Sequence, residues 1–149
     1  MTQTPYPVSP YVKTKGIVYF ARMLDKIRLH ANGKLGQDFI ENLGIGFDGR
    51  CLSFLKISYE DLKKRVLQGG SDDEILQWCF SRGRHPGAEE IEIWNHFMAK
   101  RGCRDEASER LEFRLNEAGL SKRKGEILTF FDFIEVDEGR PPQPDWWKA

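Results

Sequence analysis

The residues best suited to chemistry in this 149-residue sequence lie along its first amphipathic segment. Tyr19, Lys26 and His30 fall on one line of a helix, because their spacings of seven and four residues correspond to whole turns. Lysine can hold an anion, and histidine near neutral pH can act as a general acid or base. The same line borders an apolar stripe. Its side chains are therefore expected to cover apolar neighbours while their polar ends stay in water, unless they form a site.

A glycine-rich segment follows this line, from Gly33 to Gly49, and Arg50 comes directly after it. Its sequence has no sustained period and predicts a long irregular loop. Exposed backbone N–H groups together with lysine and arginine can bind an anion. Turns also use glycine and aspartate for conformational reasons alone, and Asp48 is equally suited to cap the next helix. The candidate ligand-binding residues are Tyr19, Lys26, Lys34, Asp48 and Arg50.

Asp132 is a charged residue in the middle of the largely apolar run of residues 126–136, EILTFFDFIEV. An isolated carboxylate is costly in an apolar environment and therefore needs a partner. We expect a salt bridge or hydrogen bond to another helix, from an arginine for example, with a ligand-facing role as the alternative. Asp132 and His30 are the candidate catalytic residues, as proton-transfer groups, if the protein is an enzyme.

Other familiar chemistry is missing from the sequence. It has no phosphate-binding loop, no HExxH zinc helix and no nucleophile elbow, so no cofactor is predicted. Glu89, Glu92 and His96 share one helix face and could ligate a metal. Glutamate and histidine four residues apart are also ordinary surface neighbours, so we expect a solvated face and no metal site.

Hydrophobic spacing predicts the elements that position these residues. Ile17, Phe20, Leu24 and Ile27 form one stripe of a helix that Gly33 ends. Ser58 with Asp61, and Ser71 with Glu74, have the spacing of capping boxes. Ile91, Trp94 and Met98 form a further stripe, widened by Ile93 and Phe97, and Gly119 fits a left-handed helix end. Residues 126–136 are apolar almost all round, which indicates a buried helix.

These patterns predict an all-α fold, a single compact domain over residues 1–149 with about six or seven short helices. Its parts are an extended arm at 1–15, a helical core at 16–138 and a proline- and tryptophan-rich tail at 139–149. Trp146 and Trp147 are expected either to fold back over the domain or to form an interaction patch.

Composition limits the class of protein. With 23 basic and 23 acidic residues the formal charge is zero, which argues against nucleic acid as a partner. Residues 1–70 carry 11 basic and 6 acidic residues, whereas residues 71–149 carry 12 and 17, so opposite charges could join two copies. Three scattered cysteines predict reduced thiols and a cytoplasmic location. No apolar run is long enough to span a membrane, so a soluble protein is expected.

Four segments resemble a bacterial family known as domain of unknown function 5069. They are SPYVKTKGIVYFARMLDKIRLHANGKLG (9–36), NLGIGFDGRCLSFL (42–55), SDDEILQWCF (71–80) and EILTFFDFIEVDEGR (126–140). The resemblance extends over nearly the whole chain and implies a small, soluble, single-domain bacterial protein. It implies no activity, substrate, cofactor or site residue.

Three functional hypotheses follow. The first is a non-enzymatic binding module for a protein partner or a small anionic ligand, because no complete catalytic constellation is present. The second is an enzyme of unfamiliar type that uses His30 or Asp132 for proton transfer. The third is a homodimeric structural or interaction protein that uses its oppositely charged halves or its terminal tryptophans.

Overall fold

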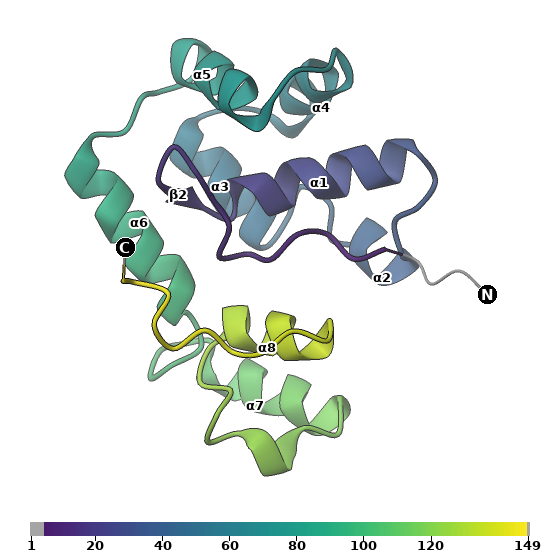
Figure 1. Ribbon diagram of the computed structural model, residues 1–149, viewed down its shortest axis with the longest axis vertical. Helices are drawn as coiled ribbons and strands as arrows, with labels where there is room; N and C mark the ends of the chain where they lie inside the picture. The colour runs from purple at the N-terminus through teal and green to yellow at the C-terminus, as the bar shows by residue number, and fades with distance from the viewer. Residues whose placement is uncertain (1–4, 149) are drawn as a thin grey trace.

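The computed structural model describes residues 5–148, which form a mostly helical chain with one very short hairpin (Figure 1). The elements in chain order are β1 (Lys13–Thr14), β2 (Ile17–Val18), α1 (Phe20–Ala31), α2 (Gln37–Ile40), α3 (Phe47–Leu55), α4 (Tyr59–Leu67), α5 (Asp72–Arg82), α6 (Ala88–Lys100), α7 (Ser108–Glu117), the 3₁₀ helix η1 (Ser121–Arg123) and α8 (Phe130–Asp137). The all-α prediction is confirmed, with eight α-helices in the described residues where six or seven were expected.

The larger of two hydrophobic cores is built from the arm, the hairpin and helices α1 and α3–α6, with one side chain from α8. α1 contacts α4, and α6 contacts both β2 and α8. The predicted stripe of α1 points into this core, since Phe20, Leu24 and Ile27 are almost completely buried. Figure 1 shows α6 running along one side of the molecule, from the end of α5 toward α8.

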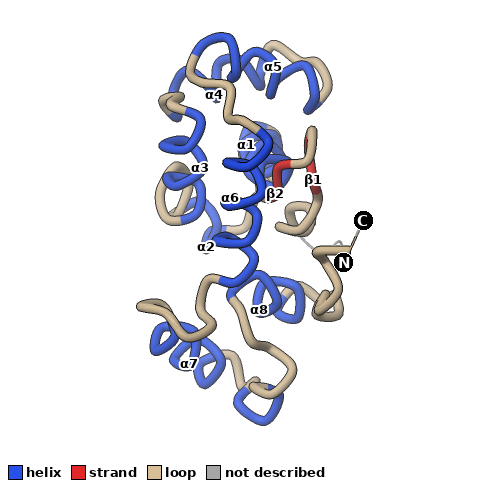
Figure 2. Tube along the Cα trace, turned by 90° about the vertical axis from the view of Figure 1, so that its left-hand side faces the viewer, coloured by secondary structure: helices blue, strands red, loops and turns tan. Residues whose placement is uncertain are grey.

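A smaller core joins α7 to α8 at one end of the molecule (Figure 2). It contains Leu111 and Leu115 of α7 together with Ile127 and Phe133. The neighbouring Phe131 of α8 is buried instead in the larger core. α8 therefore lies between two cores, which explains why its sequence is apolar almost all round.

Several predicted helix ends are confirmed by their backbone hydrogen bonds. At the end of α7 the amide of Leu120 donates to the carbonyl of Leu115 over 2.8 Å, and Gly119 has φ of 72°. These are the marks of a Schellman end, in which glycine adopts the left-handed conformation at little cost. At the start of α5, Ser71 and Glu74 form the complete capping box that their spacing predicts.

The first helix begins later than its hydrophobic spacing predicts. Ile17 belongs to β2, and Tyr19 with φ of 76° separates that strand from α1. Tertiary contacts fix this path: the amide of Val18 donates to the side chain of Asn95, and its carbonyl accepts from the indole of Trp94. Contacts to a helix about 77 residues away thus override the local helical period.

Two other boundaries also differ from the sequence prediction. The glycine-rich segment is not wholly irregular, because it contains α2 and the start of α3. The last helix begins at Phe130, with Thr129 as its cap, so residues 126–128 precede it. The amide of Phe130 donates to the carbonyl of Arg101 over 2.9 Å, which ties this start to the segment after α6.

The two ends of the chain pack against each other. Tyr11 in the arm stacks on Trp146 in the tail, with ring centroids 6.2 Å apart. Trp146 therefore folds back over the domain, which is one of the two alternatives expected for the tail. Trp147 instead remains 57% exposed. Residues 1–4 of the predicted arm and residue 149 of the tail lie outside the described residues. Among residues 5–148, no helix combines the length and the apolar character needed to cross a membrane.

Candidate functional site

Three of the predicted site residues, Tyr19, Lys26 and Asp48, meet in a buried group. Together with Gly44 they form what we call the Asp48 cluster. The phenol of Tyr19 donates to Oδ1 of Asp48 over 2.6 Å. The ammonium of Lys26 lies 3.0 and 3.1 Å from the two carboxylate oxygens. The backbone amide of Gly44 donates to Oδ2 over 3.0 Å. Asp48 is completely buried, so the glycine-rich segment folds around its carboxylate.

The local backbone explains how Asp48 reaches this position. It is the second residue of α3, and Gly46, not Asp48, occupies the cap position. The expected capping role is therefore wrong, because the side chain turns back to the amide of Gly44 within the same segment. Gly44 has φ of 78°, and a Cβ atom there would lie 3.1 Å from the ring of Tyr59. Only glycine fits both the conformation and this close approach.

Burial shifts the titration of the groups around Asp48. Loss of water lowers the pKa of Lys26, although the nearby carboxylate of Asp48 opposes this shift. Burial, reinforced by the charge of Asp48, raises the pKa of Tyr19 well above its usual value. The same two causes raise the pKa of the Cys51 thiol one helical turn further along. The cluster thus keeps the Tyr19 hydroxyl and the Cys51 thiol neutral beside Lys26 and Asp48, and its polar atoms face one another.

The line from Tyr19 to His30 is more buried than the sequence predicts. Lys26 is only 5% exposed, so the expectation that its charged end stays in water is wrong. His30 is half-buried in the last turn of α1, and Lys34 is exposed in the following turn. Neither residue contributes a side-chain hydrogen bond to the Asp48 cluster in the described part of the chain. Sequence spacing therefore located the partners of Asp48 but not a shared site with His30.

Asp132 has the partner that its burial requires, but not from a helix. Its Oδ1 accepts from the phenol of Tyr11 over 2.7 Å and from the amide of Gln143 over 3.0 Å. Its backbone amide donates to Oγ1 of Thr129. Asp132 thus connects the arm, α8 and the tail. Burial raises the pKa of Tyr11, and the hydrogen bond to Asp132 and its charge add to this effect.

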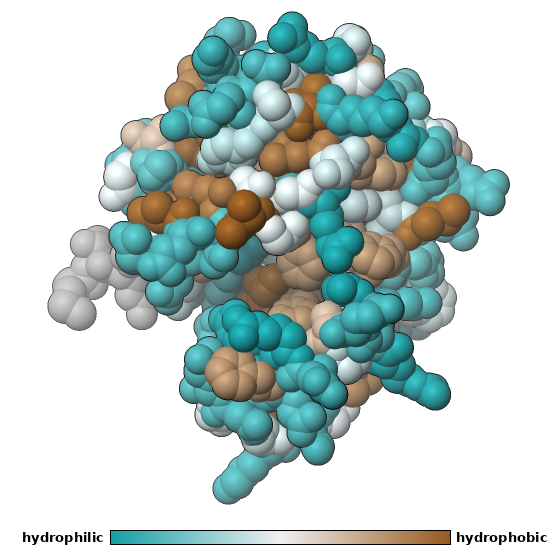
Figure 3. Space-filling model, turned by 180° about the vertical axis from the view of Figure 1, so that it is seen from behind, coloured by the Kyte–Doolittle hydropathy of each residue, from teal (hydrophilic) through white to brown (hydrophobic). Residues whose placement is uncertain are grey.

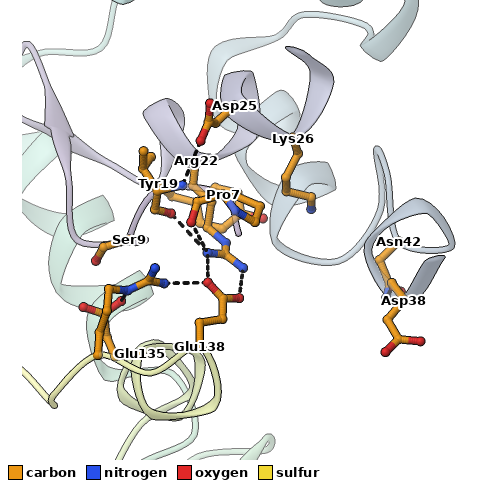
Figure 4. Close-up of polar contacts among 12 residues, drawn as sticks. Pro7, Ser9, Tyr19, Arg22, Asp25, Lys26, Asp38, Asn42, Glu135 and Glu138 are labelled. Atoms are coloured by element: carbon orange, nitrogen blue, oxygen red, sulfur yellow. Dashed lines mark hydrogen bonds and ion pairs between the residues drawn. The ribbon is translucent and has the colours of Figure 1, made fainter. Parts of the chain in front are cut away.

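A second charged network, the α1–α8 clamp, consists of Arg22, Glu135, Glu138 and Arg140 (Figure 4). Arg22 makes a bidentate pair with Glu138 at 2.9 and 2.6 Å, and its guanidinium also donates to the carbonyl of Val8. Arg140 bridges Glu138 at 2.5 Å and Glu135 at 2.8 Å. Figure 4 shows the guanidinium of Arg22 reaching from α1 to α8, while Lys26 points elsewhere. The clamp therefore fixes α1, the arm and α8 together.

The clamp was not predicted, although one signal for it is present in the sequence. Glu135 follows Thr129 and Asp132 at intervals of three residues, so it continues the polar stripe of a helix that is otherwise apolar. It is completely buried, which requires a cationic partner. Nothing in that spacing identifies Arg22, which comes from more than 100 residues earlier in the chain.

A third region, the exposed face of α6, is only partly covered by the rest of residues 5–148. Ile93 and Phe97 were expected to widen the buried stripe of this helix, and that expectation is wrong: they are 61% and 41% exposed. The guanidinium of Arg50 lies 5.1 Å from the ring centre of Phe97, and that of Arg101 lies 5.5 Å from it. Arg50 is thereby placed on this face and away from the Asp48 cluster. Figure 3 shows apolar atoms reaching the surface over α6, at the right of the view.

A shallow open hollow lies on the same helix. It is lined by Ala88, Glu89, Glu92, Ile93 and His96. Glu89, Glu92 and His96 do share a face as their spacing predicts, but in residues 5–148 no three histidine, cysteine or acidic side chains are close enough to hold a metal ion. His96 is half-buried against Trp146, with ring centroids 5.0 Å apart. The tail therefore borders this face without covering Ile93.

Within residues 5–148, fold and geometry together define a small all-α protein with two buried charged networks and an exposed apolar face on α6. The chain belongs to the family described as "Domain of unknown function (DUF5069)", whose sequence profile matches residues 4–140. The family description assigns no activity. No curated protein matches the chain.

Proposed function

We propose that this protein is a non-enzymatic interaction protein that binds another protein through the exposed face of α6. The observation that carries this proposal is the pairing of two exposed apolar side chains, Ile93 and Phe97, one helical turn apart. Apolar residues scattered singly on a surface need no explanation, whereas neighbouring ones beside a hollow are typical of binding surfaces. Burying them in a partner would gain roughly 25 cal/mol for each Å² of apolar area removed from water.

The charged groups around Phe97 support the same conclusion. Arginine and aromatic residues are enriched at protein–protein interfaces, while lysine and glutamate are depleted. Arg50 and Arg101 both lie over the ring of Phe97, so the aromatic surface and two guanidinium groups form one unit. A partner that covers the ring and offers a carboxylate to Arg50 would satisfy both, since Arg101 already pairs with Asp105 and Glu106.

The other hypotheses have less support from the geometry. Binding of a small anion by Lys26 would have to compete with Asp48, which already accepts from its ammonium at two oxygens. Proton transfer by Asp132 would have to use a carboxylate that already accepts from Tyr11 and Gln143. His30 and Lys34 have no comparable supporting contact in the described residues.

We place this function in the cytoplasm on the evidence of the cysteines. Cys51, Cys79 and Cys103 are all free, and Cys103 is exposed. Free thiols persist in a reducing compartment, whereas an oxidising one favours disulfides. Fractionation of native cells with an antibody to the protein tests this placement.

Photo-crosslinking in cells that make the protein natively tests the binding function. The photoreactive amino acid p-benzoylphenylalanine replaces Ile93 or Phe97 in separate strains. A matched control carries it at Phe113 on α7, which is 52% exposed and lies on another helix. Irradiation is expected to give a protein adduct of defined mass from positions 93 and 97 and none from position 113. The proposal fails if positions 93 and 97 give no adduct, or if all three positions give the same products.

A further inference from the structure

The hollow on α6 has the residue pattern of a packing site for a second helix. Glu89, Glu92, Ile93 and His96 stand at positions i, i+3, i+4 and i+7 of one helix. Four residues at these positions form the hole that receives a side chain from a facing helix in knobs-into-holes packing. A large exposed side chain on the facing helix is therefore the ligand that this shape suits best.

The same helix carries such a side chain one turn beyond the hole. Phe97 is 41% exposed, and it lies four residues after Ile93. When two identical helices pack antiparallel about a two-fold axis, each contact pairs residue i with residue j and residue j with residue i. A two-fold axis at the level of residue 95 along the helix brings Phe97 of each copy over the hole of the other copy. Ile93 of one copy then lies opposite Phe97 of the other.

We propose that the occupant of the α6 face is a second copy of this chain, packed antiparallel so that each Phe97 enters the partner's hole. This inference rests on the proposed function, because it names the protein that binds there. If two different proteins met at this face, the hole and the side chain that enters it would not both have to lie on α6. A two-fold pair requires both to be present on one helix, as they are in α6.

The charges on α6 fit the same arrangement. Acidic Glu89 and Glu92 line the hole at one end of the helix, and basic Lys100 lies at the other end. The antiparallel packing places Glu89 opposite Lys100 of the partner subunit. Arg50, which lies over the ring of Phe97, is carried toward the acidic rim of the partner's hole. Each end of one helix therefore meets an opposite charge.

These charges are also free to pair between copies. Within residues 5–148, the side chains of Glu89, Glu92, Arg50 and Lys100 form none of the ion pairs of the molecule. By contrast, Glu90 on the same helix is paired with Arg84 and bonded to the amide of Gly87. Of the three acidic residues of α6, the two that line the hole are thus those without an ion pair in the described residues.

The expected dimer is weak and sensitive to salt. α6 has 13 residues, so one helix pair with Arg50 at its edge gives a contact at the small end of specific interfaces, below the ~1,600 Å² of a standard one. Exposed ion pairs contribute modestly and are screened when the Debye length falls below roughly 10 Å. Dimerisation should therefore be concentration-dependent and should weaken as salt is added.

Charge reversal with mixing tests the proposal. One variant, Arg50→Glu/Lys100→Glu, reverses the basic groups, and a second, Glu89→Lys/Glu92→Lys, reverses the acidic ones. A homodimer of either variant places like charges together, so its self-association should weaken by about 10-fold or more. In an equimolar mixture the heterodimer has opposite charges at every contact, and association should return to near the wild-type level. Sedimentation velocity at low salt measures each case up to about 200 μM, a range suited to micromolar dimers.

A matched control separates this effect from charge alone. Glu109→Lys/Glu112→Lys makes the same change on exposed positions of α7, again three residues apart and again in the first turn. It should leave self-association unchanged. Circular dichroism of every variant confirms that each is folded before association is compared.

Each contrary outcome is informative. A wild-type protein that remains monomeric throughout the concentration range overturns the proposal. So does a dimer that both α6 variants leave intact, or a mixture that fails to associate when each variant alone is monomeric. If the crosslinks from positions 93 and 97 identify a different protein, this inference fails while the binding function stands. If no crosslink forms at all, both fail.

Discussion

The Asp48 cluster and the α1–α8 clamp both bury carboxylates beside cations, but they join different lengths of chain. The donors to Asp48 come from 4, 22 and 29 residues away, all within the first third of the sequence. In the clamp, Arg22 meets Glu138 across 116 residues. The first network organises one part of the larger core, whereas the second fastens the C-terminal helix to the N-terminal segments.

Their contact with water also differs. The side chain of Asp48 is 0% exposed and that of Lys26 is 7% exposed. In the clamp, Arg22 and Glu138 are equally buried, but Arg140 remains 28% exposed. A group that touches water can rehydrate when its partner is lost, whereas a sealed charge cannot. The two networks therefore share their chemistry but should differ in how strongly a single substitution affects them.

The largest effect is expected from Asp48→Ala. This change leaves the buried ammonium of Lys26 without its carboxylate, and the phenol of Tyr19 without its acceptor. Breaking a buried ion pair from one side typically costs about 3–5 kcal/mol of unfolding free energy. Urea unfolding followed by circular dichroism measures the loss.

Two further variants show whether the isolated ammonium is the cause. Lys26→Met in the Asp48→Ala background removes the uncompensated charge, so it should recover part of the lost stability. Glu126→Ala breaks an exposed pair with Arg123 and should change the unfolding free energy by only about 0.5 kcal/mol or less. If Asp48→Ala is no worse than this control, the cluster is not the stabilising ion pair described above.

A smaller and more local effect is expected from Glu138→Ala. Arg22 would keep the carbonyl of Val8, and Arg140 would keep Glu135, so both guanidinium groups retain an acceptor. We expect a loss of roughly 2–3 kcal/mol, below the full cost of an orphaned charge.

Hydrogen exchange tells the two networks apart in this variant. Because the clamp fastens α8 to α1 and the arm, amides of α8 should lose protection before those of α3. Asp48→Ala should produce the reverse order. An equal loss of protection in both helices would show that the clamp and the cluster belong to one cooperative unit, and the comparison would fail.

The sequence predicted the parts of the molecule that depend on local spacing. The stripe of α1, the capping box at Ser71 and the Schellman end at Gly119 each need only a few neighbouring residues, and all three are present. The need of Asp132 for a partner was also predictable, because a carboxylate in an apolar run cannot stay unpaired.

The remaining features depend on contacts between distant residues. The strand β2 stops before Tyr19 because Trp94 and Asn95 form hydrogen bonds to the backbone of Val18. No local sequence pattern contains that information. Likewise, Phe97 has the hydrophobicity of a core residue, and only the packing of α6 decides that it faces outward. Periodicity tells which side of a helix is apolar, but it does not tell whether the chain supplies enough partners to cover that side.

The smallest effect on stability is expected from two tyrosines that donate to buried carboxylates, one in the Asp48 cluster and one beside the clamp, at Asp132 of α8. Tyr19 donates to Asp48 and Tyr11 donates to Asp132, and burial is the main cause that raises both pKa values above 10.0. Replacement by phenylalanine should cost about 1–2 kcal/mol near neutral pH, at the lower end of what a hydrogen bond to a charged acceptor contributes.

At alkaline pH the stability that each tyrosine contributes is lost, so the difference between the wild type and each phenylalanine variant shrinks. Above about pH 10 an unfolded tyrosine loses its proton while the folded one keeps it, so stability falls by up to about 1.4 kcal/mol per pH unit for each tyrosine. Tyr19→Phe and Tyr11→Phe should each make this fall less steep, as seen in urea midpoints between about pH 8 and pH 11. Because burial raises both pKa values, the two variants should change the slope in the same direction. An equal slope in wild type and both variants would mean that neither phenol stays protonated in the folded state beyond its usual range.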